Sequence, residues 1–133
     1  PMVDLTLETL QGDTTKLSEH LVPGCYTLVH CWSGWCRPCL NEMPNLIKAY
    51  NTYHERGLNM VGIFLWDEAY NLEMLLCDYQ LPWTQLYDPT AQTSITYGIY
   101  SIPEIMLIAP DGTIAARSLR GAELFDTLDS IFG

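Results

Sequence analysis

Basic residues are scarce in this sequence. Six Lys and Arg residues stand against sixteen Asp and Glu residues, which gives a net charge of −10 at neutral pH. A chain this acidic is repelled by the phosphates of nucleic acids and by anionic lipid surfaces. The composition therefore argues against nucleic acid and against a membrane surface as partners.

Long apolar runs are missing as well. No stretch approaches the ~18 consecutive apolar residues of a membrane span, and the first residues show neither the basic nor the apolar region of a signal peptide. Hydrophobic residues nevertheless make up 48% of the chain and charged residues only 17%. This balance is typical of a packed globule, and we expect residues 1–133 to form one domain.

The cysteines are too few and too poorly placed for a disulfide-stapled scaffold. There are five, an odd number, so at least one is unpaired in a monomer. Cys25 and Cys31 would lie about 20 Å apart along one strand at ~3.3 Å per residue, which is too far to bridge. We expect both to be small core residues. Cys77 lies off the apolar face of its predicted helix, and we expect it to be a spectator thiol.

The two remaining cysteines, Cys36 and Cys39, lie where a strand turns into a helix. Residues 26–32 (YTLVHCW) are apolar and β-prone, and residues 37–54 carry apolar side chains every three or four positions. At a helix N-terminus, free N–H groups and the helix dipole stabilise a thiolate, so the pKa of Cys36 is expected to be depressed. Helical spacing puts the two Cα atoms roughly 5–6 Å apart, within disulfide range. The pattern predicts a reversible Cys36–Cys39 redox pair.

The rest of the chain alternates predicted strands and helices. Buried strands are expected at 25–32 and 59–66, because near-continuous apolar runs indicate burial on both faces of a sheet. The helix that begins at Cys36 should kink at Pro44, which cannot donate to the Leu40 carbonyl. The other expected elements are a hairpin of 2–10 and 16–18, a helix at 68–80, a strand at 82–87, a helix at 91–97, a hairpin of 104–109 and 113–117, and a last helix from 121.

The segment WCRPCLNEMP (35–44), following an apolar strand, resembles the thioredoxin superfamily and in particular its TlpA/ResA-like branch. The resemblance extends over nearly the whole chain. It implies a thioredoxin-like α/β fold, in which a central mixed β-sheet is flanked by helices on both faces. An N-terminal β-hairpin and a helix–strand insertion before a cis-proline complete the implied fold. The cis-proline would be Pro103, in the dipeptide Ile102-Pro103.

The resemblance also implies a protein-disulfide oxidoreductase that reduces partner proteins through a mixed disulfide. Cys36 would attack as a thiolate, Cys39 would resolve, and the free backbone of Ile102 would pair with an extended partner segment. The residues implied to shape the surface around Cys36 are Trp35, Pro38 and Pro103. Apart from the redox-active disulfide itself, neither an organic cofactor nor a metal is expected. The implied partners are disulfide-containing proteins and an upstream electron donor, in the bacterial periplasm or at the outer face of the cell envelope.

Two titratable residues near the motif have two interpretations each. His30 stands six residues before Cys36, where thioredoxin has a buried acid, so a neutral imidazole there would accept the proton of Cys39. The alternative is a core histidine bonded to backbone. Glu42 matches the glutamate of the C-x-x-C-x-x-E pattern. Its carboxylate would relay protons, or it would disfavour a nearby thiolate. The positive charge of Arg37 would instead stabilise the Cys36 thiolate. The alternative is a solvated glutamate that complements the helix dipole.

Two other functions compete with disulfide exchange. Ser33-x-x-Cys36 nearly matches the Thr-x-x-Cys setting of peroxiredoxins, although Trp35, Pro38 and the adjacent Cys39 favour disulfide exchange. A metal-binding module would use Cys36, Cys39 and His30, but there is no second C-x-x-C to complete a zinc site.

Overall fold

A computed structural model describes residues 2–133, which build a seven-stranded mixed sheet. The strand order across the sheet is β2-β1-β5-β4-β3-β6-β7. The strands are β1 (Thr6–Glu8), β2 (Thr14–Lys16), β3 (Tyr26–Trp32), β4 (Leu58–Leu65), β5 (Thr84–Asp88), β6 (Glu104–Ile108) and β7 (Ile114–Ala116).

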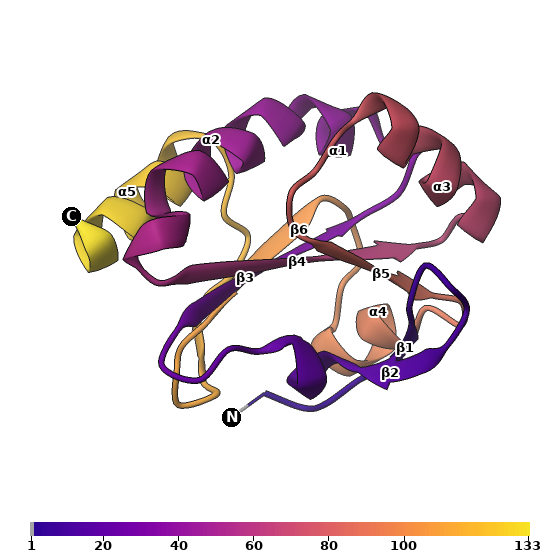
Figure 1. Ribbon diagram of the computed structural model, residues 1–133, viewed down its shortest axis with the longest axis horizontal. Coiled ribbons are helices and arrows are strands. Elements are labelled where there is room, and N and C mark those ends of the chain that lie inside the picture. The colour runs from indigo at the N-terminus through magenta and orange to yellow at the C-terminus, as the bar shows by residue number, and fades with distance from the viewer. Residues whose placement is uncertain (1) are drawn as a thin grey trace.

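Helices cover both faces of this sheet. One face carries α1 (Arg37–Asn41), α2 (Met43–Tyr53), α3 (Ala69–Asp78) and α5 (Ala122–Phe132), as Figure 1 shows. The short helix α4 (Gln92–Tyr97) and the 3₁₀ turn η1 (Leu17–His20) lie on the other side, and a second 3₁₀ turn, η2 (His54–Arg56), follows α2. This is the thioredoxin-like arrangement that the resemblance implied, with α3, β5 and α4 lying between β4 and Pro103.

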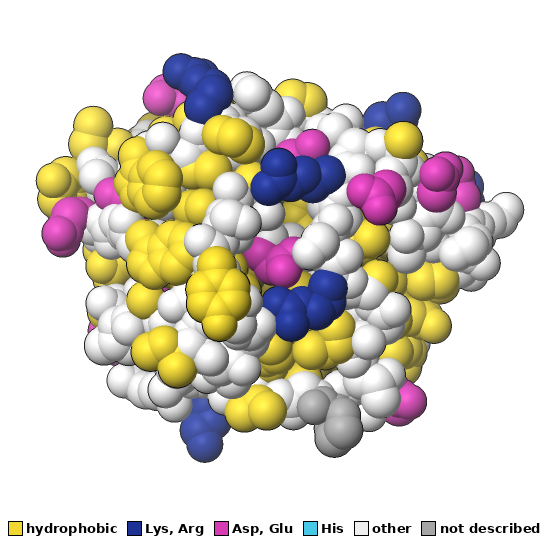
Figure 2. Space-filling model, turned by 180° about the vertical axis from the view of Figure 1, so that it is seen from behind, with side chains coloured by type: hydrophobic (Ala, Val, Ile, Leu, Met, Phe, Trp, Pro, Cys, Tyr) yellow, Lys and Arg dark blue, Asp and Glu magenta, His cyan; other side chains and the backbone are white. Residues whose placement is uncertain are grey.

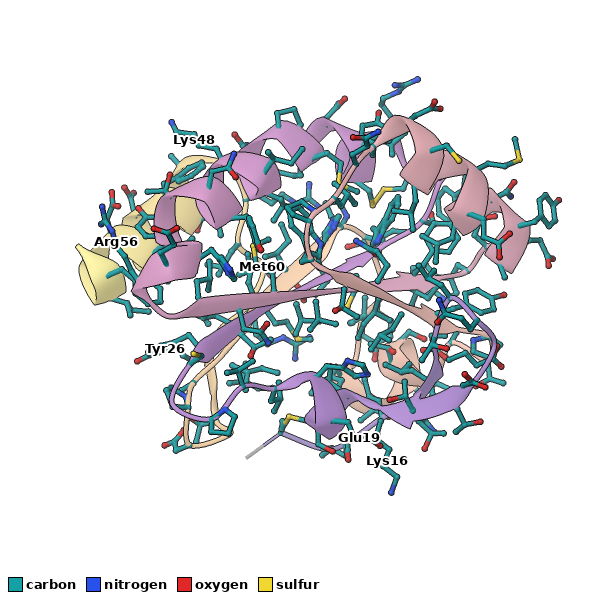
Figure 3. The ribbon with its side chains drawn as sticks, in the orientation of Figure 1. Lys16, Glu19, Tyr26, Lys48, Arg56 and Met60 are labelled. Atoms are coloured by element: carbon teal, nitrogen blue, oxygen red, sulfur yellow. A yellow bond between two sulfur atoms is a disulfide. The ribbon has the colours of Figure 1, made fainter. Side chains whose placement is uncertain are left out.

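The central strands β3 and β4 are buried along almost their whole length, because both faces are covered. They pair in parallel, and β3 pairs on its other side with β6 in the antiparallel sense. In this register His30 lies opposite Gly62 on one side and Ile105 on the other. Figure 3 shows the side chain of Met60 between β4 and the overlying helices, whereas Lys48 projects from α2 into solvent.

The helix after Cys39 is divided at Glu42, as the position of Pro44 predicted. Glu42 ends α1 and begins α2, and Pro44 lies in the first turn of α2. A proline is tolerated there, since the N–H groups of a first helical turn have no partner within the helix. The predicted kink is therefore confirmed, as a break two residues before the proline.

The N-terminal hairpin is present but shorter than expected, and its second extended piece ends early. Residues 17–18 begin η1 instead of extending a strand. Leu17 is fully buried there, and the Ser18 N–H donates to the Asp4 carboxylate at 3.0 Å. That side-chain acceptor turns the backbone away from β1. Within residues 2–133 no helix has the length and apolar character needed to cross a membrane.

Candidate active site

Cys36 occupies the junction between β3 and α1, as the sequence predicted. It is the N-cap of α1, with extended backbone angles, and its sulfur accepts a hydrogen bond from the Cys39 N–H at 3.2 Å. The Leu40 N–H donates to the Cys36 carbonyl at 3.2 Å. Because the Cys39 N–H of the helix start faces the sulfur, this position favours the thiolate form of Cys36.

Cys36 and Cys39 form a disulfide whose Cα atoms are 5.2 Å apart. This separation lies in the range expected from helical spacing. Only 4% of Cys36 is exposed in this closed form, and Cys39 is fully buried. The helix cap and the neighbouring chain around Ile102 cover the sulfur. Cys36 is still the more accessible of the two.

The Ile102-Pro103 segment faces the cysteine pair, sixty-six residues along the chain from it. The Ile102-Pro103 peptide bond is cis, which confirms the expectation. The Ile102 carbonyl oxygen lies 3.5 Å from the Cys36 sulfur. Arg120 donates to the Pro103 carbonyl at 3.3 Å, so the chain after the last strand fixes the far side of this segment.

Trp35 directly precedes Cys36 in the chain and is 63% exposed. Its indole N–H donates to the Trp66 carbonyl at 2.8 Å, and the neighbouring Gly34 N–H donates to Asp67 Oδ2 at 2.9 Å. Asp67 Oδ1 also accepts from the Glu68 N–H and from Asn71 Nδ2, each at 2.7 Å. Asp67 thus fastens the loop before Cys36 to the start of α3.

Sequence reasoning missed the link from Asp67 to Gly34 because Gly34 belongs to another strand–helix junction, 33 residues away. The one local signal was an aspartate placed directly between a buried strand and a helix, where such a side chain often accepts backbone N–H bonds.

A match to known proteins now places this geometry in a family. A family model described as AhpC/TSA matches residues 1–117. The chain belongs to the AhpC/TSA family. It is 26% identical to the thioredoxin domain of a thiol-disulfide oxidoreductase from Bacteroides vulgatus, with a TM-score of 0.87 over 98% of this chain and 94% of that one.

Curated relatives of this AhpC/TSA protein have names that refer to the same chemistry. It is 25% identical to the thiol-disulfide oxidoreductase ResA of Geobacillus thermodenitrificans, over 84% of this chain and 63% of the relative. It is 28% identical to the thiol:disulfide interchange protein DsbE of Allochromatium vinosum, over 86% of this chain and 62% of the relative. The chain therefore spans somewhat less than two thirds of the length of these relatives.

His30 lies on β3 of the AhpC/TSA domain, fully enclosed by protein. Its ring stacks on Trp32, with centroids 5.9 Å apart and planes 7° from parallel. Within residues 2–133 neither ring nitrogen has a hydrogen-bond partner. The alternative interpretation, a core histidine hydrogen-bonded to backbone, is therefore not found in this form. Burial lowers the pKa of His30 to about 3, which keeps the imidazole neutral at physiological pH. The predicted proton-acceptor role needs this neutral form, and that role stays a prediction.

Trp32 contacts a buried polar group that the sequence did not reveal. Gln85 on β5 accepts a hydrogen bond from the Trp32 indole N–H at 3.0 Å. Its side chain crosses Gly62 on β4, where a Cβ atom would lie only 2.6 Å from Gln85 Nε2. Strand periodicity predicts a buried position here but does not predict which distant side chain meets Trp32.

Glu42 is half-buried and is held toward the start of α5. Its Oε2 accepts from Asn45 Nδ2 at 3.4 Å and from the Gly121 N–H at 3.5 Å. It also lies at the N-terminus of α2, where a carboxylate is favoured by the helix dipole. These contacts give Glu42 a structural part, and the proton-relay role stays a prediction.

The residues behind the two competing functions are placed less favourably. Ser33, the counterpart of the peroxiredoxin threonine, is fully buried and its hydroxyl has no partner among the described residues. No group of three or more His, Cys, Asp or Glu residues that could hold a metal occurs within residues 2–133.

Proposed function

We propose that this protein is a thiol–disulfide oxidoreductase that reduces disulfides of partner proteins. The observation that carries the proposal is the Cys36–Cys39 pair itself, closed across one helical turn at 5.2 Å between Cα atoms and facing the Ile102 carbonyl. The names of its curated relatives and of its structural neighbour support the same chemistry.

The reaction begins from the reduced dithiol. The Cys36 thiolate attacks one sulfur of a partner disulfide, the partner S–S bond breaks, and the departing sulfur takes up a proton. Cys39 then loses its proton and attacks the Cys36 sulfur of the mixed disulfide. The second partner thiol leaves, and the Cys36–Cys39 disulfide forms. Two electrons and two protons pass to the partner, so a separate electron donor must reduce the pair again.

The neighbouring residues support these steps in different ways. Pro38, in the first turn of α1, needs no N–H partner and stabilises the helix start under Cys36. Trp35 and Pro103 shape the surface around the sulfur, and Ile102 offers its backbone to the partner segment. His30, neutral at physiological pH, is the candidate acceptor for the Cys39 proton in the second step, and Glu42 is the further candidate for proton relay.

The partners follow from the chemistry, and the location follows from the resemblance. They are disulfide-containing proteins and an upstream reductant, at the outer face of a bacterial cell envelope or in the periplasm. The Cys36–Cys39 pair stores both electrons, so the reaction needs neither an organic cofactor nor a metal.

A disulfide-reduction assay tests the proposal. Reduced wild-type protein is mixed with a disulfide-containing substrate protein, and the Cys36→Ser variant is expected to lose at least 99% of the rate, since it lacks the attacking thiolate. Cys77→Ser, which removes an exposed thiol on α3, serves as the matched control and is expected to keep the full rate. A wild type that consumes hydrogen peroxide rapidly while leaving protein disulfides intact would instead support the peroxiredoxin function.

A further inference from the structure

A groove of about 550 Å³ opens beside the redox site, between the loop before Cys36 and helix α3. One wall is the loop, through Gly34 and Trp35. The opposite wall is a single face of α3, together with Asp67 two residues before it, since its members recur every three or four positions. These members are Asp67, Asn71, Met74, Leu75 and Asp78.

The groove has an apolar floor and a negative charge. Met74 is 65% exposed and, with Leu75 and Trp35, presents hydrocarbon and aromatic surface. Figure 2, which views the molecule from behind, shows hydrophobic side chains gathered over the half of that face where α3 and α4 lie. Among the described residues, the lining of the groove holds two carboxylates and no Lys or Arg.

The two carboxylates differ in what they contact. Asp67 accepts three hydrogen bonds from Gly34, Glu68 and Asn71 and is thereby fixed. The side-chain carboxylate of Asp78 has no hydrogen-bond or ion-pair partner within residues 2–133, and Asp78 is the last residue of α3. A carboxylate at a helix C-terminus meets the negative end of the dipole, which is unfavourable until a cation approaches.

We propose that this groove binds a lysine or arginine side chain of the partner polypeptide, close in sequence to the cysteine that Cys36 attacks. The aliphatic stem of such a side chain packs along Met74, Leu75 and Trp35, and its charged end pairs with Asp78. A second copy of this chain fits poorly, since it brings the same net charge of −10. The inference rests on the proposed function and adds the class of substrate that the site prefers.

Short peptides joined by one disulfide test the groove. A series carries a single Lys one, two or three residues to either side of the cysteine, with matched Gln and Glu peptides, and the rate of reduction by the reduced protein is measured. The best-placed Lys peptide is expected to react about threefold faster than its Gln counterpart, the size of effect typical of an exposed ion pair. The Glu counterpart is expected to react more slowly than either.

Two variants and a small disulfide compound test whether the groove, and not another part of the protein, causes the preference for Lys peptides. Asp78→Asn is expected to make the Lys and Gln rates equal. Glu73→Gln removes the same charge from α3 but outside the groove, and it is expected to keep the preference. A Lys preference that survives Asp78→Asn, or is absent in the wild type, overturns the groove proposal. Hydroxyethyl disulfide, uncharged and too small to span the groove, is expected to be reduced equally by all three proteins. If the reduced wild type reduces neither the peptides nor this small disulfide, the proposed function fails as well.

Discussion

The imidazole of His30 lies fully enclosed, stacked on Trp32, without a partner for either nitrogen among the described residues. Its pKa is lowered to about 3 because burial penalises the charged form. Unfolding exposes the ring and restores a pKa near 6.5. Between these two values the unfolded chain binds a proton that the folded protein does not bind.

His30 therefore makes folding stability depend on pH. Because the unfolded state binds more protons in this window, stability is full above pH 6.5 and is lost as the pH falls toward 3. We predict that the unfolding free energy of the wild type falls by about 3 kcal/mol relative to that of His30→Leu between pH 6.5 and 4. Urea unfolding of both proteins at each pH measures this change. All other titratable groups are the same in the two proteins, so their contributions cancel in the comparison. A constant difference would contradict a neutral, buried His30.

The same variant also tests whether His30 takes part in disulfide exchange or has only a structural role. If His30 accepts the Cys39 proton, His30→Leu slows release of the mixed disulfide more than its formation. Equal effects on both steps, or none, would leave only the structural interpretation. Stopped-flow measurement of the two phases gives the ratio directly.

At the scale of single residues, local sequence predicted the redox pair but missed the side chains that hold the surrounding loop and strand in place. Cys36 and Cys39 lie three residues apart, so helical spacing alone determined their separation. Asp67 and Gln85 act on residues 33 and 53 positions away, and such partners depend on how strands are ordered in the sheet. No periodicity within a short window carries that information.

At the scale of elements, the side chain of Gln85 links three neighbouring strands, β5, β4 and β3. Its amide crosses Gly62 on β4 to reach Trp32 on β3. Glycine inside a strand is usually unfavourable, so alanine would normally stabilise such a position by about 0.5–1 kcal/mol. Here the added Cβ would displace the Gln85 amide and leave the Trp32 indole N–H buried without a partner.

We therefore predict that Gly62→Ala destabilises the protein by about 1–3 kcal/mol, the cost of an unsatisfied buried donor. In a Gln85→Ala background the same substitution is expected to be neutral or stabilising, because the clash is gone. Thermal or denaturant unfolding of the four proteins in this cycle gives the coupling. Equal effects of Gly62→Ala in both backgrounds would contradict the packing described here.

The elements themselves were predictable where hydrophobic periodicity is strong. The long strands β3 and β4 and the helices α2, α3 and α5 lie where the patterns placed them, within one to three residues. The N-terminal piece at 17–18 was wrong, because the bond from Ser18 to Asp4 joins residues fourteen positions apart. The break near Glu42 was foreseen since its cause, Pro44, is local.

At the scale of the whole molecule, the mixed sheet with helices on both faces and the cis-proline near Cys36 were expected from the resemblance, since pattern alone does not determine topology. The order of the seven strands came from the structure. The fold places at one end of the sheet the start of α1, the Ile102-Pro103 segment and the groove along α3. The net charge of −10 adds a long-range preference for cationic partners. A disulfide-bearing segment that approaches this end meets the sulfur of Cys36 first, since Cys39 is fully buried.

The central claim is that Cys36 alone attacks and Cys39 alone resolves. Cys39→Ser tests it most directly, because the first attack remains and the second is blocked, so mixed disulfides accumulate. After incubation with disulfide-containing proteins, mass spectrometry of the non-reduced digest identifies the linked cysteine. The account predicts adducts through Cys36 that vanish when Cys36 is also replaced and persist when Cys25, Cys31 or Cys77 is replaced instead. Adducts through the exposed Cys77 that survive loss of Cys36 would contradict it.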